Sequence, residues 1–226
     1  MSGSIATWAD TTAEEDAMND DHAPLWRRMI ALSVPAGDLQ DKAVLDFGCN
    51  QGGFLEMLYR RAPYKEGTGV DIAASSVAVA KQRLAKLPVT LGSPDILEKK
   101  SAHYDTVFSH EVFYLLPDLA GHAALLRKIL KPGGVYFAAI GCHTDQPLWP
   151  SWKVHISSYS NVKVQDYSLD DYAGAFFDAG FKVSAQPYRM EGFFPLKPKN
   201  PYFPKVADSL RYYDNDKVLF RFERSA

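Results

Sequence analysis

Residues 44–54 read VLDFGCNQGGF, and this stretch decides the fold. A short apolar run ends at an acid, and a glycine-rich turn then leads into a segment with the apolar spacing of a helix. Gly48 permits the sharp turn, and Gly52 or Gly53 lets the helix begin close to the sheet. The free N–H groups and the dipole of such a helix predict a site for polar or negative ligand groups at this turn.

Asn50 stands where a dinucleotide-binding fingerprint has its middle glycine. Asparagine is one of the few non-glycine residues that tolerate a positive φ, so we expect the turn to keep its geometry. Asp71 ends the next predicted strand, where an acid can accept hydrogen bonds from both ribose hydroxyls of an adenine nucleoside. The alternative for Asp71 is a cap of the helix that follows.

The rest of the chain alternates between strands and helices. The predicted strands are 43–47, 66–72, 89–91, 104–109, 135–140, 181–190 and 217–224. The predicted helices are 23–33, 54–61, 75–87, 118–130 and 168–180, with KPGG at 131–134 ending the fourth of them. Strands that alternate with helices indicate a parallel sheet with right-handed crossovers. We expect an α/β fold with a Rossmann-like seven-stranded, mostly parallel sheet, an antiparallel final strand and helices on both faces.

The bulk composition fits one α/β domain with additions. The chain has 226 residues, of which 46% are hydrophobic, and no apolar run approaches the roughly 20 residues of a membrane helix. Its two cysteines are too few for a disulfide framework, which favours a cytoplasmic setting. The net charge of −2 argues against a dedicated nucleic-acid binder. The polar, acidic N-terminus does not have the pattern of a signal peptide.

Three segments are predicted to cover the sheet's carboxyl end. Residues 1–40 form an arm and one helix that act as a cap or lid, and residues 41–226 form the main domain. Lid insertions are expected at about 141–166 and 191–216, because long aromatic loops over such a sheet edge usually build a substrate lid. The alternative for these loops is a packed loop or an oligomer contact. The arm carries Asp10, Glu14, Glu15, Asp16, Asp20 and Asp21.

The ordered set of motifs resembles the class I S-adenosylmethionine-dependent methyltransferases. The matching pieces are VLDFGCNQGGF (44–54), GVDIA (69–73), GSPDIL (92–97), YDTVFSHEVFYLLPD (104–118), LLRKILKPGGVYFAAI (125–140) and SLDDYAGAFFDAGFKV (168–183). The resemblance covers about 43–190, and its specificity lies in the order and spacing of the pieces. The family's acid and GxGxG pattern appears as Asp46-x-Gly48-x-Asn50-x-Gly52, so the cradle around the methionine end should differ at Asn50.

The resemblance implies S-adenosyl-L-methionine as cofactor, S-adenosyl-L-homocysteine as product and no metal. The implied contacts are Asp46, Gly48, Cys49, Asn50 and Gly52 at the amino-acid end, Asp71 at the ribose, Ile72, Ser93, Pro94 and Asp95 around the adenine, and Ser109 and His110 beside the methyl group, with Phe54 as a further contact. Either Asp95 or a backbone amide meets the exocyclic amine. The alternative for Asp95 is a turn residue after Pro94. Trp8 of the arm is expected to close over the cofactor.

Methyl transfer from a sulfonium needs mainly in-line placement of a nucleophile and exclusion of water. A general base helps where the acceptor must lose a proton. His110 is the first candidate for this base, because strand carboxyl ends are where such sheets bind ligands. His143 is the second, with Asp145 close to it in sequence. The alternative for His110 is a hydrogen-bonded residue that shapes the pocket.

The leading hypothesis is methylation of an oxygen or nitrogen of a small or medium-sized acceptor. A nucleic-acid or protein acceptor is the nearest alternative, indicated only by a basic stripe of Arg189, Lys197, Lys199 and Lys205, which is usually a solvated face. A non-catalytic cofactor-binding module is another. The sequence leaves the oligomeric state open.

An NAD-dependent oxidoreductase is a further alternative from a different enzyme class. It would have glycine at position 50 and a tyrosine–lysine pair on a helix, whereas Tyr159 and Lys163 lie in a segment without a helical apolar face. Asn200-Pro201-Tyr202-Phe203 resembles a motif of methyltransferases that act on nitrogen. That motif belongs after the fourth strand, so we interpret this match as coincidence.

Overall fold

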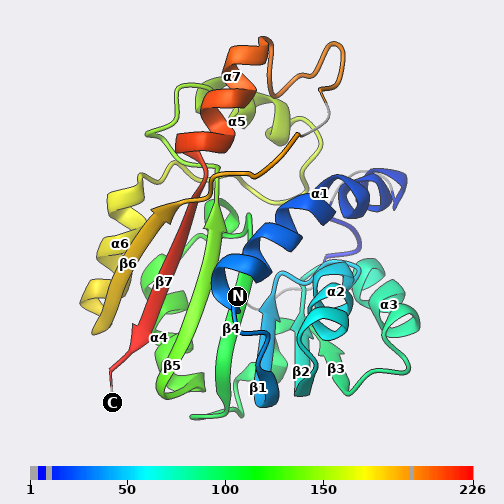
Figure 1. Cartoon of the computed structure of the whole chain (residues 1–226), viewed down its shortest axis with the longest axis vertical. Coiled ribbons are helices and arrows are strands. Elements are labelled where there is room, and N and C mark those ends of the chain that lie inside the picture. The colour runs from blue at the N-terminus through cyan, green and yellow to red at the C-terminus, as the bar shows by residue number, and fades with distance from the viewer. Residues whose placement is uncertain (1–4, 9–11, 194–195, 226) are drawn as a thin grey trace.

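The computed structural model describes residues 5–8, 12–193 and 196–225, without the side chains of residues 12–20. Seven strands form one sheet in the order β3-β2-β1-β4-β5-β7-β6 (Figure 1). They are β1 Leu39–Phe47, β2 Tyr64–Val70, β3 Val89–Gly92, β4 Tyr104–His110, β5 Leu130–Ile140, β6 Phe181–Pro187 and β7 Val218–Arg224. Among these seven strands, β7 alone runs in the opposite direction to the other six. The predicted fold class is confirmed.

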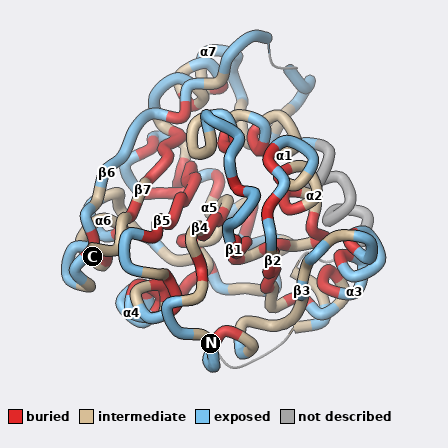
Figure 2. Tube along the Cα trace, turned by 60° about the horizontal axis from the view of Figure 1, so that its bottom comes forward, coloured by how far each residue is buried: buried red, intermediate tan, exposed pale blue. Residues whose placement is uncertain are grey.

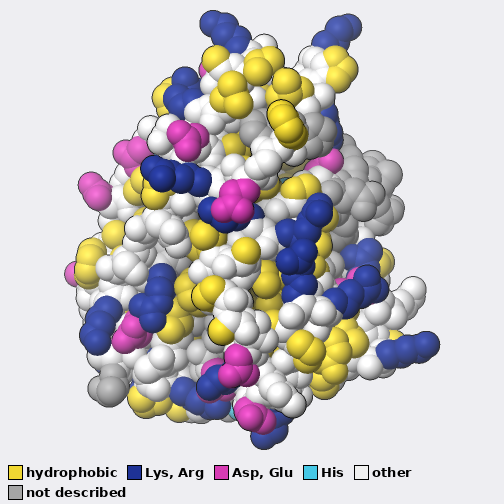
Figure 3. Space-filling model, viewed as in Figure 1, with side chains coloured by type: hydrophobic (Ala, Val, Ile, Leu, Met, Phe, Trp, Pro, Cys, Tyr) yellow, Lys and Arg dark blue, Asp and Glu magenta, His cyan; other side chains and the backbone are white. Residues whose placement is uncertain are grey.

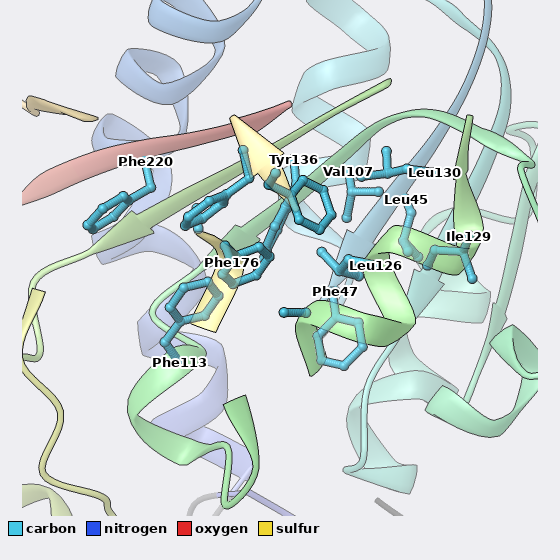
Figure 4. Close-up of a cluster of buried hydrophobic side chains, with 14 of the residues drawn as sticks. Leu45, Phe47, Val107, Phe113, Leu126, Ile129, Leu130, Tyr136, Phe176 and Phe220 are labelled. Carbon is cyan, nitrogen blue, oxygen red and sulfur yellow. The ribbon is translucent and has the colours of Figure 1, made fainter. Parts of the chain in front are cut away.

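Helices cover both faces of the sheet. One face packs against α1 Thr12–Ser33, α2 Gly53–Arg61 and α3 Ala74–Arg83, and the other against α4 Leu119–Ile129 and α6 Leu169–Asp178. The cluster on the α4 and α6 side is drawn in Figure 4, where Phe113 and Phe176 stack beside Tyr136. Figure 2 shows the central strands as largely buried traces with exposed helix surfaces around them.

The two-residue period of the strands sorts the polar residues of the fourth strand between the two faces. Phe108 packs in the cluster on the α1 and α2 side, and Val107 packs in the cluster on the α4 and α6 side. Ser109 lies on the same face as Val107, because its hydroxyl forms a 2.6 Å hydrogen bond with the hydroxyl of Tyr136 on the α4 and α6 side. His110 therefore lies on the same face as Phe108.

Several predicted boundaries are wrong. The first helix begins at Thr12 rather than near residue 23, with Pro24 inside it, because its first turns carry acids without an apolar spacing. The third helix ends at Arg83. KPGG does not form a separate turn after the fourth helix. That helix ends at Ile129, and KPGG lies in the irregular start of β5, where Gly133 has a φ of 75°.

The predicted irregular stretch 141–166 contains a helix, α5 Trp149–Ser157. It lies beyond the carboxyl ends of the parallel strands, together with α7 Val206–Arg211 and the π-helical turn Tyr212–Asp216 (Figure 1). Trp152 joins these segments, since its indole N–H donates to the Tyr202 carbonyl at 2.6 Å and its ring packs on Tyr212. The segments predicted as lids thus form one aromatic cluster above the sheet.

Candidate active site

A cavity of about 130 Å³ lies over the glycine turn, at the carboxyl ends of β1, β2 and β4. Parallel sheets of this kind bind ligands at this edge, where the strand order reverses. The cavity brings together nine of the predicted cofactor contacts: Asp46, Gly48, Cys49, Asn50, Phe54, Asp71, Ile72, Pro94 and His110. The cysteine in this set, Cys49, is a free thiol.

The turn has the backbone geometry expected from the sequence. Asn50 adopts a φ of 43°, which confirms the predicted left-handed residue. Gly48 has a φ of 82°, and a Cβ there would lie 2.5 Å from a methyl of Val112. Gly52 also has a positive φ, and it packs against Leu84 and does not line the cavity. Glycine at 48 allows Val112, another lining residue, to lie close to the turn, whereas glycine at 52 allows the start of α2 to approach α3.

Asp71 joins the glycine turn to the start of the next helix. Its carboxylate accepts hydrogen bonds from the Asn50 N–H at 2.8 Å and from the Ala73 N–H at 2.9 Å. The N-cap of α3 is Ala73, so Asp71 is not the capping residue. A carboxylate has about four lone-pair sites, so Asp71 can still accept bonds from a ligand that enters the cavity.

Two groups at the bottom of the cavity fit a ligand that carries a positive charge and N–H donors. Burial, with a smaller contribution from Asp71, raises the pKa of Asp46 to about 8. The amide oxygen of Asn50 is buried and has no hydrogen-bond partner within the described residues. A ligand ammonium would satisfy both groups, since it donates hydrogen bonds and favours the ionised carboxylate.

The raised pKa of Asp46 predicts an unusual dependence of stability on pH. Its folded pKa lies above the unfolded value, so the folded protein binds more protons between about pH 4 and pH 8, and stability falls as pH rises through this window. We expect unliganded Asp46→Asn to be more stable than the wild type by roughly 5 kcal/mol at pH 8, and by only about 1.5 kcal/mol near pH 5. Urea unfolding at several pH values measures this, with exposed Asp41→Asn as control. A difference that does not change with pH would contradict the assignment.

A second, larger cavity of about 600 Å³ adjoins the first. The two cavities share Trp8, His22, His110, Glu111 and Tyr114 as lining residues. Its walls come from α1, the region around α5 and the insert before β7, and they include all of Asn200-Pro201-Tyr202-Phe203. The segment interpreted as a coincidental match therefore lies at the site, although it comes from another part of the fold than the motif it resembles.

His110 lies where the two cavities meet. Its Nε2 is buried and has no hydrogen-bond partner in the described part of the chain. Its ring packs edge-on against His22 with 4.8 Å between centroids. Burial, followed by the nearby Lys217 and His22, holds the pKa of His110 well below its ordinary value, and burial lowers that of His22 to about 4. Both rings are neutral at physiological pH.

The structure does not bring every predicted site residue to these cavities. His143 lines neither cavity as the described residues form them, and its Nε2 lies 2.7 Å from the Asp216 carbonyl oxygen. Ser109 faces Tyr136 on the opposite side of the sheet. Ser93 and Asp95 hydrogen-bond each other beside the cavity, whereas Pro94 between them lines it.

Sequence reasoning missed an ion pair at the junction of the cavities. The Lys217 ammonium donates to the Glu111 carboxylate, whose other oxygen accepts the Gly141 N–H at 3.1 Å. Lys217 is fully buried, with its Nζ 5.4 Å and 5.9 Å from the ring centroids of Tyr188 and Tyr212. The sequence carried a signal for Glu111 alone, because it directly follows His110 at the end of a predicted strand.

The basic stripe of Arg189, Lys197, Lys199 and Lys205 does not form a continuous positively charged surface. Lys197 pairs with Asp21, and Arg189 lies 3.8 Å from Asp214. Figure 3 shows lysine and arginine side chains spread over one face and interspersed with acids. Of the acidic residues in the N-terminal arm, Asp21 is described, and the side chains of Asp10, Glu14, Glu15, Asp16 and Asp20 lie outside the described residues.

Two searches for other kinds of site found none in the described residues. No three histidine, cysteine or acidic side chains are grouped so that they could hold a metal ion. Among the described residues, no helix is long and apolar enough to span a bilayer.

The strand order, the antiparallel last strand and the glycine turn below a cavity define the Rossmann-like methyltransferase class. Comparison with known proteins agrees. The model of a methyltransferase domain family matches residues 45–136. The chain is 30% identical to trans-aconitate 2-methyltransferase of Rhodopseudomonas palustris strain BisB18 over 62% of this chain and 53% of that protein. It is 26% identical to malonyl-[acyl-carrier protein] O-methyltransferase of Priestia megaterium, over 74% and 63% of the two chains.

Solved structures show the same fold. A chain of the complex between the Haloferax volcanii Trm112 methyltransferase activator and a methyltransferase superposes with a TM-score of 0.78, at 23% identity over 95% of both chains. Geranyl diphosphate C-methyltransferase from Streptomyces coelicolor superposes with a TM-score of 0.64, at 17% identity over 88% of this chain and 75% of that one. Together the domain match, the curated relatives and the shared fold support a class I S-adenosylmethionine-dependent methyltransferase. It spans between half and two thirds of the length of the two curated relatives named above.

Proposed function

We propose that the protein transfers the methyl group of S-adenosylmethionine to an oxygen or nitrogen of a small or medium-sized acceptor. The observation that carries this proposal is the meeting of two cavities at His110 and Glu111, one over the glycine turn and one under the aromatic lid. The cofactor supplies an activated methyl group on its sulfonium, so the protein's main tasks are to align the acceptor and to exclude water.

The residues of the smaller cavity suit each part of the cofactor. Asp46 and the amide oxygen of Asn50 would take the ammonium of the amino-acid end. Asp71 would accept hydrogen bonds from the ribose hydroxyls, and Ile72 and Pro94 would pack against the adenine. Asp95 is exposed outside this cavity, which favours a backbone amide as the partner of the exocyclic amine.

The N-terminal arm and the two insertions would act together as a lid. The Ile5 N–H donates to the Ile72 carbonyl at 2.9 Å, and the Asn161 N–H donates to the Trp8 carbonyl at 3.0 Å. The arm thus passes from the adenine side of the smaller cavity to the segment after α5, and Trp8 lines both cavities. In this arrangement the described parts of the arm and helix (residues 1–40) and of the insertions at about 141–166 and 191–216 close the site from water.

His110 is the histidine placed to contact an acceptor. His110 lines both cavities, and its buried Nε2 has no hydrogen-bond partner within the described residues, so it can form a hydrogen bond that orients the nucleophile. His143, the second candidate for a base, would need a different side-chain position to reach the acceptor, since its Nε2 is engaged with the Asp216 carbonyl. The balanced net charge and the two free, buried cysteines support a small-molecule acceptor in the cytoplasm over a nucleic acid.

A ligand thermal-shift series tests the cofactor assignment. We expect S-adenosylhomocysteine and S-adenosylmethionine to raise the melting temperature, because a ligand at 100 times its Kd stabilises by about 2.7 kcal/mol. NAD at the same concentration should leave the melting temperature unchanged. Stabilisation by NAD and not by the methionine-derived ligands would contradict the proposal.

Turnover separates an enzyme from a non-catalytic binding module. Formation of S-adenosylhomocysteine is followed with trans-aconitate and malonyl-[acyl-carrier protein], the acceptors named for the two relatives, together with small phenols and amines. Formation of S-adenosylhomocysteine that depends on an added acceptor supports methyl transfer. Tight binding of both cofactor forms with no turnover on any acceptor favours the binding module.

A further inference from the structure

Glu111 occupies an unusual position for a charged residue. It lines both cavities at the end of β4, and its backbone has a φ of 55°. Left-handed backbone is uncommon for a glutamate and tends to occur at functional sites, where the surrounding structure holds it in place. Here Lys217, the Gly141 N–H and the Tyr212 hydroxyl all bond its carboxylate.

This carboxylate is kept charged inside the protein. Burial alone would raise the pKa of Glu111, but the adjacent Lys217 ammonium outweighs burial and holds the pKa below its ordinary value. Removing two charges from water is unfavourable, so a buried ion pair is weak evidence for a purely stabilising role. An ionised carboxylate at the junction of two cavities is, however, a strong hydrogen-bond acceptor for a ligand.

Two groups at the junction of the cavities, His110 and Glu111, can accept a proton. Protonation of the Glu111 carboxylate is electrostatically more favourable than protonation of His110. A proton on His110 would create an imidazolium in a site that already holds Lys217, and the pKa of His110 is depressed accordingly. A proton on Glu111 creates no new charge. The combined charge of ion pair and cofactor also stays the same, since the sulfonium loses its positive charge as the carboxylate loses its negative one.

The walls of the larger cavity indicate what the acceptor looks like. Aromatic rings line it from several elements, including Trp8, Tyr114, Trp152, Tyr202, Tyr212 and Tyr213. Flat aromatic ligands pack well against such rings, in offset or edge-to-face arrangements. The Glu111 carboxylate and the aromatic lining of the larger cavity together fit an aromatic ring that carries a hydrogen-bond donor.

We infer that the acceptor is a hydroxylated or aminated aromatic ring, and that Glu111 accepts the proton of its nucleophile while Lys217 holds the carboxylate in position. The inference rests on the proposed methyl transfer. The acceptor's oxygen or nitrogen bonds to the methyl carbon, the carbon–sulfur bond breaks with its electron pair left on sulfur, and the acceptor's proton passes to Glu111. The proton then leaves to solvent through the larger cavity.

Binding of three matched probes tests the inference without turnover. NMR titrations measure the Kd of 4-methylphenol, 4-methylanisole and 4-methylbenzoate, with S-adenosylhomocysteine at saturation. The phenol stays protonated up to about pH 10, as tyrosine does. We expect the wild type to bind the phenol roughly tenfold or more tighter than the anisole, and Glu111→Gln to remove this preference, because a hydrogen bond to a charged group contributes about that much. The anisole affinity should change by less than about threefold.

The outcomes separate this inference from the proposed function. If S-adenosylhomocysteine does not bind the wild type, the cofactor assignment itself fails. If it binds but the phenol binds no better than the anisole, or the benzoate binds best, the inference is wrong and the cofactor assignment stands. Equal phenol affinity in the wild type and Glu111→Gln also overturns the inference.

The role of Lys217 as a positioning residue has its own readout. The titratable groups of the described residues that interact electrostatically with Glu111 are Lys217, His22, Cys142, Tyr114, Tyr172, Tyr188, Tyr202, Tyr212 and Tyr213. Without Lys217 burial raises the pKa of Glu111, so phenol affinity in Lys217→Met should fall as pH is lowered through the neutral range. Lys217→Arg should keep the pH-independent affinity of the wild type. The same pH dependence in all three proteins would contradict the positioning role.

Discussion

Lys217→Met is expected to lower the free energy of unfolding by about 3–5 kcal/mol, the range measured when one partner of a buried ion pair is removed. The methionine fills similar space, but it leaves the Glu111 carboxylate buried without its cation. Urea unfolding at pH 7, with stability extrapolated to water, measures the loss. The effect is large because the remaining hydrogen bonds, from Gly141 and Tyr212, do not supply a compensating charge.

Two further variants make this prediction specific. The double variant Lys217→Met/Glu111→Gln removes both charges and should recover more than half of the lost stability. Lys182→Met is the matched control, since Lys182 is 72% exposed and its ion pair with Glu223 spans 3.5 Å at the surface, where such pairs contribute at most about 1 kcal/mol. Equal losses of unfolding free energy in Lys217→Met and Lys182→Met would contradict the prediction, since the buried pair of Lys217 and Glu111 would then contribute no more than a surface pair.

Asp71→Ala is expected to weaken S-adenosylhomocysteine binding by at least about a hundredfold. Two hydrogen bonds from a carboxylate to the ribose hydroxyls contribute roughly 1.5–3 kcal/mol each, and their loss lowers affinity by a factor of ten for every 1.4 kcal/mol. The variant also releases the Asn50 and Ala73 N–H groups that Asp71 holds. Isothermal titration calorimetry at fixed pH measures the change.

Asp95→Ala is the control for this measurement. Asp95 is an acid in the same predicted cofactor set, but it is exposed and lies outside the cavity. We expect its replacement by alanine to change the affinity by less than about threefold. Comparable losses for the two variants would place the adenine edge against Asp95, and an unchanged affinity in Asp71→Ala would refute the ribose assignment.

The fold was predictable from local signals in the sequence. Apolar strands, glycine turns and helix caps are read from a few neighbouring residues, and the predicted helix at 168–180 begins at a capping box formed by Ser168 and Asp171. The helix α5 was missed although Trp149, Trp152 and Ile156 have helical spacing, because the surrounding loop residues obscured the short pattern. The irregular start of β5 depends on pairing with β4, which no local pattern reveals.

The lining of the smaller cavity was predictable for the same reason, whereas the junction of the two cavities was not. Asp46, Asn50 and Asp71 follow directly from strand ends and a turn. Alternation along β4 could have separated Ser109 from His110, since neighbouring strand residues face opposite sides. The pairing of Glu111 with Lys217 joins residues far apart in the chain, and a single sequence carries no signal for such a contact.

The central claim is that the methyl group of the cofactor lies at the junction of the two cavities. Nuclear Overhauser effects from the ¹³C-labelled methyl group of bound S-adenosylmethionine test it most directly. The account predicts contacts from this methyl to the ring protons of His110 and Tyr114, the shared lining residues. Contacts confined to Ile72 and Pro94, at the other end of the smaller cavity, would contradict it.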